Sequence, residues 1–172
     1  MFTVRSSDGN GLVRVTTNPY GGHDSPGGSS PDGTRIAFWR ENPSLHQFAL
    51  FVVNVNGSDL HQVSGWQPDF GSASWSPDGQ WILTSNGEGG LYIIHPDGSD
   101  QRQITLATGP GNFLASGPKW SPDGKRIVFA LSSASAGNQK DIFTAQANGT
   151  DLRQVTNTSA KEEFPDWGQP SS

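Results

Sequence analysis

The chain has 172 residues, of which 16% are charged and 32% are hydrophobic, and it carries a formal net charge of −5 and no cysteine. This acidic balance excludes the basic footprint of a nucleic-acid-binding domain and disfavours an anionic membrane surface. The absence of cysteine excludes disulfides, thiolate metal sites and a cysteine nucleophile. The longest apolar run, Phe48 to Val53, is far too short for a membrane span, and the first nine residues lack the pattern of a secretory signal.

Turn-forming residues are abundant, with 22 glycines and 12 prolines, and four segments align without gaps around a turn glycine. In each segment Asn or Asp precedes the glycine, and Val or Ile stands six residues after it. Because Asn-Gly and Asp-Gly accept the positive φ of tight hairpin turns, each segment predicts a β-hairpin. The four predicted hairpins cover 2–16, 50–64, 91–105 and 142–156.

A second motif, Ser-Pro-Asp-Gly, alternates with these hairpins and begins at Ser30, Ser76 and Ser121. Proline fixes φ at the first turn position, aspartate bonds its own backbone, and glycine takes the left-handed position, so the motif predicts a tight turn between two further strands. The position directly before the motif recurs about every 45 residues. These residues are Ser29, Trp75, Trp120 and, in a partial fourth copy, Trp167. We expect the repeated tryptophans to pack between neighbouring repeats.

Two hairpins in each repeat give four short strands, which is the signature of a β-propeller blade. The predicted fold class is all-β, a β-propeller of four-stranded antiparallel blades with about 3.5–4 blades present, which makes it a partial or half-propeller. We name the strands of a blade a to d from the propeller axis outward. Residues 1–172 are then a single domain with a partial blade at 1–16, blades at about 25–64, 72–105 and 117–156, and a closing strand a at 162–168.

The Ser-Pro-Asp-Gly-x-x-Ile-x-Phe pattern, followed by segments such as LYIIHPDGSDQRQIT, resembles the WD40-like PD40 repeat of TolB-like propellers. The resemblance covers almost the whole chain in three to four copies. Members of this family resemble six- or seven-bladed rings, whereas this chain holds fewer than four complete blades. We therefore expect it to be the C-terminal part of a larger propeller, or a half-propeller that completes a ring by forming a homodimer.

The chain shows no pattern of a catalytic or metal site. The aspartates of the turns lack the twelve-residue spacing of an EF-hand, and local bonding to the backbone explains them. The four histidines fall in different repeats without metal-ligand spacing, and no Gly-x-Ser-x-Gly elbow occurs. We therefore expect a protein that is not an enzyme and has no cofactor or metal.

Residues that do not follow the repeat are the better candidates for binding, because loops carry function on a rigid scaffold. Such residues fall mainly in the predicted d-to-a loops, at 17–24, 65–71 and 106–117, and one belongs to the carboxylate pair Glu162-Glu163. The candidate binding residues are Tyr20, His23, Trp66, Asp69, Phe70, Asn112, Phe113 and Glu162. On this interpretation Trp66 serves binding, and its removal changes stability by less than about 1 kcal/mol.

The sequence favours a non-catalytic propeller that binds a protein partner on the face bearing the d-to-a and b-to-c loops. The TolB-like resemblance implies that this partner is a peptidoglycan-associated lipoprotein and that the protein lies in the periplasm, in the bacterial cell envelope. One alternative is a propeller domain from a prolyl-oligopeptidase-like peptidase. Another is a carbohydrate-binding propeller, which depends on the loop aromatic residues alone.

Overall fold

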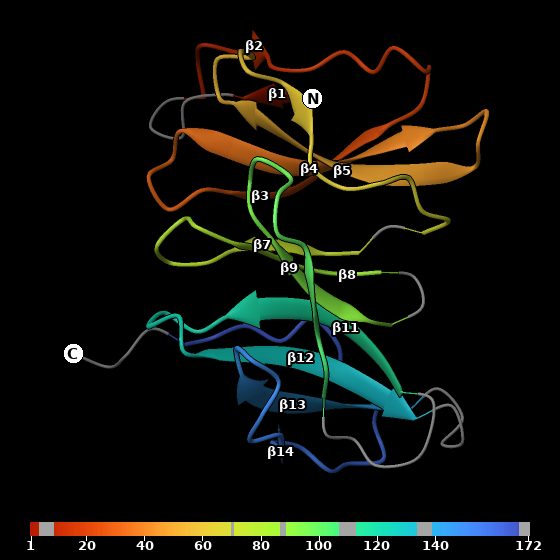
Figure 1. The fold of residues 1–172 in the computed structure, drawn as a ribbon, viewed down its shortest axis with the longest axis vertical. Helices are drawn as coiled ribbons and strands as arrows, with labels where there is room; N and C mark the ends of the chain where they lie inside the picture. The colour runs from red at the N-terminus through yellow and green to blue at the C-terminus, as the bar shows by residue number, and fades with distance from the viewer. Residues whose placement is uncertain (4–8, 70, 87–88, 107–112, 134–138, 169–172) are drawn as a thin grey trace.

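The computed structural model describes residues 1–3, 9–69, 71–86, 89–106, 113–133 and 139–168. These residues form three four-stranded sheets and one two-stranded sheet, all antiparallel, which follow one another along the long axis of the molecule (Figure 1). They include no helix, and hence none that is long and apolar enough to cross a membrane. The predicted all-β fold with four-stranded propeller blades is confirmed.

We call the sheets the N-terminal hairpin and blades 1 to 3. The N-terminal hairpin pairs β1 (Phe2–Thr3) with β2 (Val13–Arg14). Blade 1 contains β3 (Asp24–Ser29), β4 (Arg35–Asn42), β5 (Gln47–Asn54) and β6 (His61–Gln62). Blade 2 contains β7 (Ala73–Trp75), β8 (Ile82–Ser85), β9 (Leu91–Ile94) and β10 (Arg102–Ile104). Blade 3 contains β11 (Phe113–Trp120), β12 (Arg126–Ser133), β13 (Lys140–Gln146) and β14 (Arg153–Gln154). The first strands β3, β7 and β11 contact one another in succession, so they are the inner strands.

The Ser-Pro-Asp-Gly turns share one hydrogen-bond pattern. In the first copy, the hydroxyl of Ser30 donates to Asp32 Oδ1 at 2.5 Å and accepts from the Arg35 N–H at 2.9 Å. The Thr34 N–H donates to the same carboxylate oxygen at 3.0 Å. The second and third copies repeat these contacts. The aspartate of each motif therefore holds its own turn together, in keeping with local side-chain to backbone bonding.

The turns of the outer hairpins carry contacts between neighbouring sheets. A Cβ on Gly57 would lie 3.1 Å from the carbonyl oxygen of Val15 in the preceding sheet, and a Cβ on Gly149 would lie 2.3 Å from that of Thr105. Both glycines have positive φ. Glycine is required at these turns for the left-handed backbone and for the close approach of the neighbouring chain.

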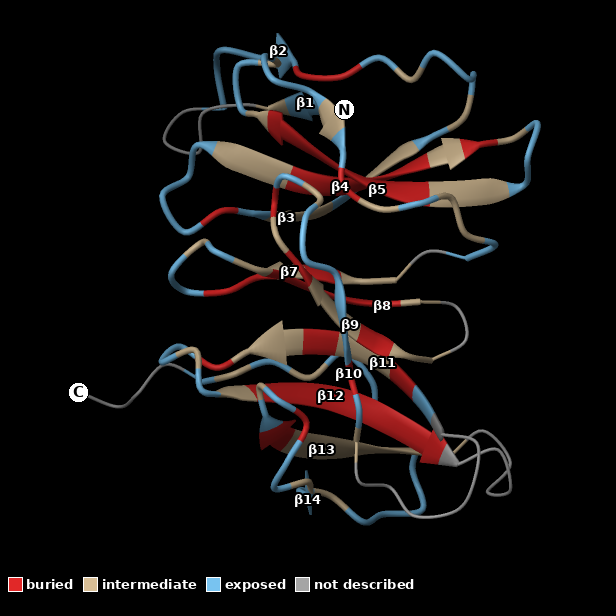
Figure 2. Ribbon diagram, viewed as in Figure 1, coloured by how far each residue is buried: buried red, intermediate tan, exposed pale blue. Residues whose placement is uncertain are grey.

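One hydrophobic cluster lies between each pair of neighbouring sheets. Figure 2 shows that burial is concentrated in the central strands, and in blade 1 it covers 37–40 of β4 and 49–53 of β5. Phe38 and Phe51 belong to the cluster beside the N-terminal hairpin, and Phe129 belongs to the one between blades 2 and 3. Each blade is therefore packed by its neighbours, as repeat architectures require.

Two of the repeated tryptophans, Trp75 and Trp120, lie at the junctions between blades, and Trp167 lies beside blade 3. Trp75 is buried, and its Nε1 donates to the carbonyl of Gly28 in the inner strand of blade 1 at 3.1 Å. Trp167 Nε1 donates at 3.4 Å to the carbonyl of Lys119, which holds the same position in blade 3. Trp120 packs half-buried against the cluster between blades 2 and 3, and within the described residues its buried Nε1 has no hydrogen-bond partner.

The segment 162–168 lies beside blade 3. The Glu162 N–H donates to the Lys140 carbonyl at 2.9 Å, and a Cβ on Gly117 would lie 3.7 Å from Pro165 Cδ. In the described part of the chain no strand ladder includes this segment. The closing strand at 162–168 therefore stays a prediction.

Candidate functional site on the loop face

The antiparallel order of the strands puts the d-to-a and b-to-c loops at one end of every blade and the tight turns at the other. We call these ends the loop face and the turn face. Most of the predicted binding residues fall on the loop face, but Phe70 and Asn112 lie outside the described residues. Phe113 opens β11, where its backbone is paired opposite Ser133.

Tyr20 and Trp66 come from different loops and are in contact. Their ring centroids lie 5.4 Å apart with the planes nearly perpendicular, a favourable edge-to-face geometry. Trp66 is half-buried against the cluster beside the N-terminal hairpin, 6.2 Å from the ring of Phe51. Reciprocal backbone hydrogen bonds of 2.8 Å between Gln67 and Phe48 hold its loop on β5. Because its ring packs against the end of this cluster, the structure leads us to expect a larger contribution of Trp66 to stability than its place in a non-repeating loop predicts.

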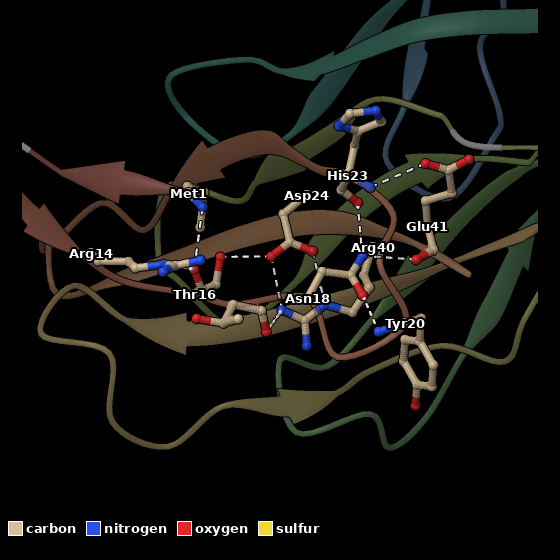
Figure 3. A network of polar contacts seen from close by, with 10 residues as sticks. Met1, Arg14, Thr16, Asn18, Tyr20, His23, Asp24, Arg40 and Glu41 are labelled. Carbon is tan, nitrogen blue, oxygen red and sulfur yellow. Dashed lines mark hydrogen bonds and ion pairs between the residues drawn. The ribbon is translucent and has the colours of Figure 1, made fainter. Parts of the chain in front are cut away.

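The loop that carries Tyr20 and His23 is fixed by backbone-directed hydrogen bonds (Figure 3). Asn18 Nδ2 donates to the carbonyl of Glu41 at 2.8 Å, and Asn18 Oδ1 accepts from the Tyr20 N–H at 2.9 Å. The His23 N–H donates to Glu41 Oε2 at 3.1 Å, and the Glu41 N–H donates to the His23 carbonyl at 2.9 Å. The loop therefore presents His23 and the 45%-exposed Tyr20 from a defined conformation.

A buried ion pair lies beneath this loop. Arg40 Nε and Nη2 donate to the two carboxylate oxygens of Asp24 at 2.8 Å each, and both side chains are only 3% exposed. Thr16 Oγ1 donates to Asp24 Oδ2 at 2.6 Å, and Arg40 Nη2 also reaches the Thr17 carbonyl at 3.2 Å (Figure 3). Burial raises the pKa of Asp24, but the hydrogen bonds from Arg40 and Thr16 outweigh it and hold that pKa below its ordinary value.

This ion pair was not among the predicted site residues. A charged Arg40 within the apolar run of β4 was the available signal, because an arginine at a buried strand position requires an anionic partner. Asp24 at the start of β3 is that partner. The pair joins the N-terminal hairpin to blade 1 through Thr16 and supports the loop that follows it.

A cavity of about 530 Å³ opens on the loop face between blades 2 and 3. Asp69, Asn86, Lys140, Lys161, Glu163 and Phe164 are among its lining residues. Lys140 Nζ donates to Glu163 Oε1 at 2.8 Å and to Ser116 Oγ at 3.1 Å, and Lys161 Nζ lies 3.2 Å from Glu163 Oε1. These lysines, Lys140 foremost, hold the pKa of Glu163 below its ordinary value, so the cavity contains an ionised cluster.

Glu162 and the two residues that follow it differ in whether they line this cavity. Glu162 does not line the cavity; its Oε1 accepts from Thr158 Oγ1 at 3.0 Å, and its Oε2 is buried without a partner in the described part of the chain. Glu163 does line it, as does Phe164, whose side chain is 85% exposed and whose φ is 56°. Sequence reasoning did not identify Phe164, and it interpreted Glu163 as a solvated charge on a loop. The signal lay in the Phe-Pro-Asp-Trp segment, which was interpreted as a strand.

The predicted residues thus form two groups. Tyr20, His23 and Trp66 gather at the end of blade 1, while Asp69 lines the cavity between blades 2 and 3. Among the described residues, no group of three or more histidine, aspartate or glutamate side chains is arranged to hold a metal ion. Exposed aromatic rings, paired charges and a shallow cavity are features of a surface that binds another molecule.

This chain is similar to known proteins in both sequence and fold. No protein-family model matches the chain. It is 31% identical over 119 residues to dipeptidyl-peptidase 5 of Porphyromonas endodontalis, covering 65% of this chain and 17% of that protein. It is 32% identical over 125 residues to a TolB homologue of Chlorobium luteolum, covering 68% of this chain and 26% of that protein. The crystal structure of TolB from Acinetobacter baumannii matches 94% of this chain and 39% of that chain, with a TM-score of 0.70 and 17% identity.

The chain spans about a quarter or less of the length of these two curated relatives. The similarity to the solved TolB structure concerns the fold, and the similarity to the TolB homologue is one of sequence. The Ser-Pro-Asp-Gly turns, the four-stranded blades and both similarities agree. The chain belongs to the TolB-like β-propellers.

Proposed function

We propose that this chain is a non-catalytic propeller that binds a protein partner on its loop face. The observation that carries the proposal is the cavity of about 530 Å³ with the highly exposed Phe164 beside the ion-paired Lys140 and Glu163. An exposed aromatic ring beside polar and charged groups is a common feature of protein interfaces. Tyr20 and His23 extend the same face at blade 1.

The partner that fits the TolB-like resemblance is a peptidoglycan-associated lipoprotein in the bacterial cell envelope, with the propeller in the periplasm. The similarity to the TolB homologue supports this choice. The cavity carries both signs of charge, with Lys140 and Lys161 beside Asp69 and Glu163. Such a mixed rim favours a specific polar partner surface over a simple polyanion or polycation.

A binding titration tests this function. The soluble domain of the peptidoglycan-associated lipoprotein from the same genome is titrated into this chain by calorimetry. Phe164→Ala should weaken binding by about tenfold or more, as expected for a central aromatic residue. Leu60→Ala, at an outer hairpin turn on the turn face, is the matched control and should leave the affinity unchanged. Absence of binding, or equal affinity of both variants, contradicts the proposal.

A second candidate function is a propeller domain of a peptidase. The 31% identity to dipeptidyl-peptidase 5 favours it, because that similarity covers 65% of this chain. In prolyl-oligopeptidase-like enzymes a separate α/β-hydrolase domain follows such a propeller. The two candidates are separated by the gene sequence around this chain, since a Gly-x-Ser-x-Gly nucleophile elbow downstream supports the peptidase.

Self-association of two copies into a closed ring also stays a prediction of the sequence. Light scattering of the purified chain measures it directly. A mass of two chains at micromolar concentration supports ring closure by a second copy, and a monomer at all concentrations contradicts it.

A further inference from the structure

A second cavity, of about 600 Å³, lies on the turn face between blades 2 and 3. Its apolar lining includes Trp81, Ile93, Ile104 and Trp120, and its polar lining includes Asp78 and Asp123. The cavity is separate from the loop-face site, because the turns and the loops lie at opposite ends of the blades (Figure 1). Its volume lies in the range of about 300–1,000 Å³ typical of binding pockets.

The equivalent place at the neighbouring junction is filled by the chain itself. Between blades 1 and 2, the guanidinium carbon of Arg35 lies 4.8 Å from the centre of the Trp75 ring. Arg35 is the sixth residue of the Ser-Pro-Asp-Gly motif, and Trp75 stands directly before the next copy. This is a cation–π contact, which is favourable over a tryptophan face. The junction between blades 1 and 2 therefore accommodates an arginine guanidinium over the ring of its tryptophan.

Between blades 2 and 3 the arginine is replaced. Trp81 occupies the sixth position of its motif, and Trp120 is the counterpart of Trp75. The Trp81 ring lies edge-to-face with His95 at 4.0 Å, and the guanidinium of Arg102 lies 5.1 Å from its centre. Trp81 is thus engaged within blade 2, and in the described part of the chain no cation covers Trp120. The substitution leaves a cavity where the previous junction has a guanidinium.

The charges around the cavity also suit a cation. Hydrogen bonds from the Ser76 hydroxyl and the Gln80 N–H lower the pKa of Asp78, and equivalent bonds lower that of Asp123, so both carboxylates are ionised at neutral pH. Arg102, which also lines the cavity, is ion-paired with Asp100 outside it. Two carboxylates and a tryptophan face make this an anionic, aromatic site.

We propose that this cavity is a second docking site, which receives an arginine side chain of a partner protein. The guanidinium lies over the face of Trp120 within reach of Asp78 and Asp123, and the aliphatic stem packs against Ile93 and Ile104. Arginine fits better than lysine, because its planar group stacks on aromatic rings and binds carboxylates through two donors. The site goes beyond the proposed function, since it lies on the opposite face and needs no residue of the loop-face cavity.

The test uses the peptides acetyl-Gly-Arg-Gly-amide and acetyl-Gly-citrulline-Gly-amide, which differ in the charge of one side chain. Nuclear magnetic resonance of the assigned indole N–H groups reports where each peptide binds. We expect the arginine peptide to shift the Trp120 and Trp81 signals with an affinity about tenfold higher than that of the citrulline peptide. Equal shifts from both peptides, or shifts confined to Trp66 on the loop face, overturn the proposal.

Two variants test whether the arginine peptide binds in this cavity. Trp81→Arg restores the arrangement seen at Arg35 and Trp75, so the new side chain should cover Trp120 and abolish peptide binding while the chain stays folded. Asp123→Asn keeps the oxygen that accepts the turn hydrogen bonds but removes the charge, and should weaken binding severalfold. Phe164→Ala, on the loop face, is the control and should bind the peptide normally. Undiminished binding by Trp81→Arg, or tighter binding of a neutral oligosaccharide in the cavity, also overturns the proposal.

Discussion

Arg40 and Asp24 form a bidentate ion pair inside the protein, with both N–H···O contacts at 2.8 Å and both side chains almost wholly shielded from water. The guanidinium also lies 5.0 Å from the ring of Phe51 and 5.3 Å from that of Phe38. This one pair therefore connects the inner strand of blade 1, its second strand and the hydrophobic cluster beside the N-terminal hairpin.

Breaking this pair should be costly. Asp24→Asn leaves the Arg40 charge buried without its counter-ion, and we expect a loss of about 3–5 kcal/mol in the free energy of unfolding. The matched control is Asp100→Asn, which removes the acidic partner of the exposed Arg102 and should leave the denaturation midpoint unchanged. Denaturant melts measure both. Equal effects of the two variants would show that the buried pair does not stabilise the fold.

The lowered pKa of Asp24 makes stability depend on pH in a defined direction. Its folded pKa lies below the ordinary value of 3.8, so its contribution is complete above that value and is lost as the pH falls through the folded pKa. Asp32, whose pKa is lowered to about 2 by hydrogen bonds from Ser30 and Thr34, extends this loss toward pH 2. Melting temperatures should therefore be flat from pH 7 to about 5 and fall below about pH 4, with a shallower fall in Asp24→Asn.

Trp66 and Tyr20 should differ in their effect on stability. Trp66→Ala removes a half-buried ring from the end of a core cluster and should cost about 2 kcal/mol or more. Tyr20→Ala removes a more exposed ring that contacts the edge of that tryptophan, and should cost less than about 1 kcal/mol. Chemical denaturation distinguishes these values, and the reverse order would mean that Trp66 serves binding alone.

The close approach between blades predicts a difference between two glycines that both have positive φ. Gly33→Ala introduces backbone strain but no contact, because nothing lies within 4 Å of its Cβ position, and should cost about 1 kcal/mol. Gly149→Ala adds to that strain a clash with the Thr105 carbonyl of blade 2, and should cost a further 1–3 kcal/mol or so. Similar melts for both variants would contradict the assigned contact between blades 2 and 3.

Two tryptophans at equivalent positions should respond differently to the loss of the indole N–H. Trp75→Phe removes a donor that bonds Gly28 and should cost about 1 kcal/mol beyond the change in ring size. Trp120→Phe removes a buried donor that has no partner in the described residues, so this cost should be absent. Unfolding free energies of the two variants, compared as a pair, check this expectation.

The fold was predictable because its signals are local and repeated. Asp32 and Gly33 specify a turn through bonds that span only a few residues, and the same chemistry recurs in every blade. Two other features occur only once and join separate elements: the contact between Tyr20 and Trp66, and the ion pair between Asp24 and Arg40. No repeated pattern in the sequence therefore indicates them. Phe164 escaped notice because the register of Trp167 pointed to a strand, whereas the structure exposes Phe164 at a left-handed turn of the backbone.

The contacts between blades determine which segment of such a chain can be inserted or deleted without loss of packing. In blades 1 to 3 each outer turn glycine lies against the end of the preceding sheet. In blades 2 and 3 each inner turn glycine lies next to the proline of the preceding motif, as Gly79 does to Pro31 and Gly124 to Pro77. Blades 2 and 3 therefore contact the preceding blade through the same turn positions. Excision or duplication of one whole repeat of about 45 residues joins surfaces that already fit, whereas a cut within a repeat separates them. The repeat is accordingly the natural unit of insertion and deletion in this protein.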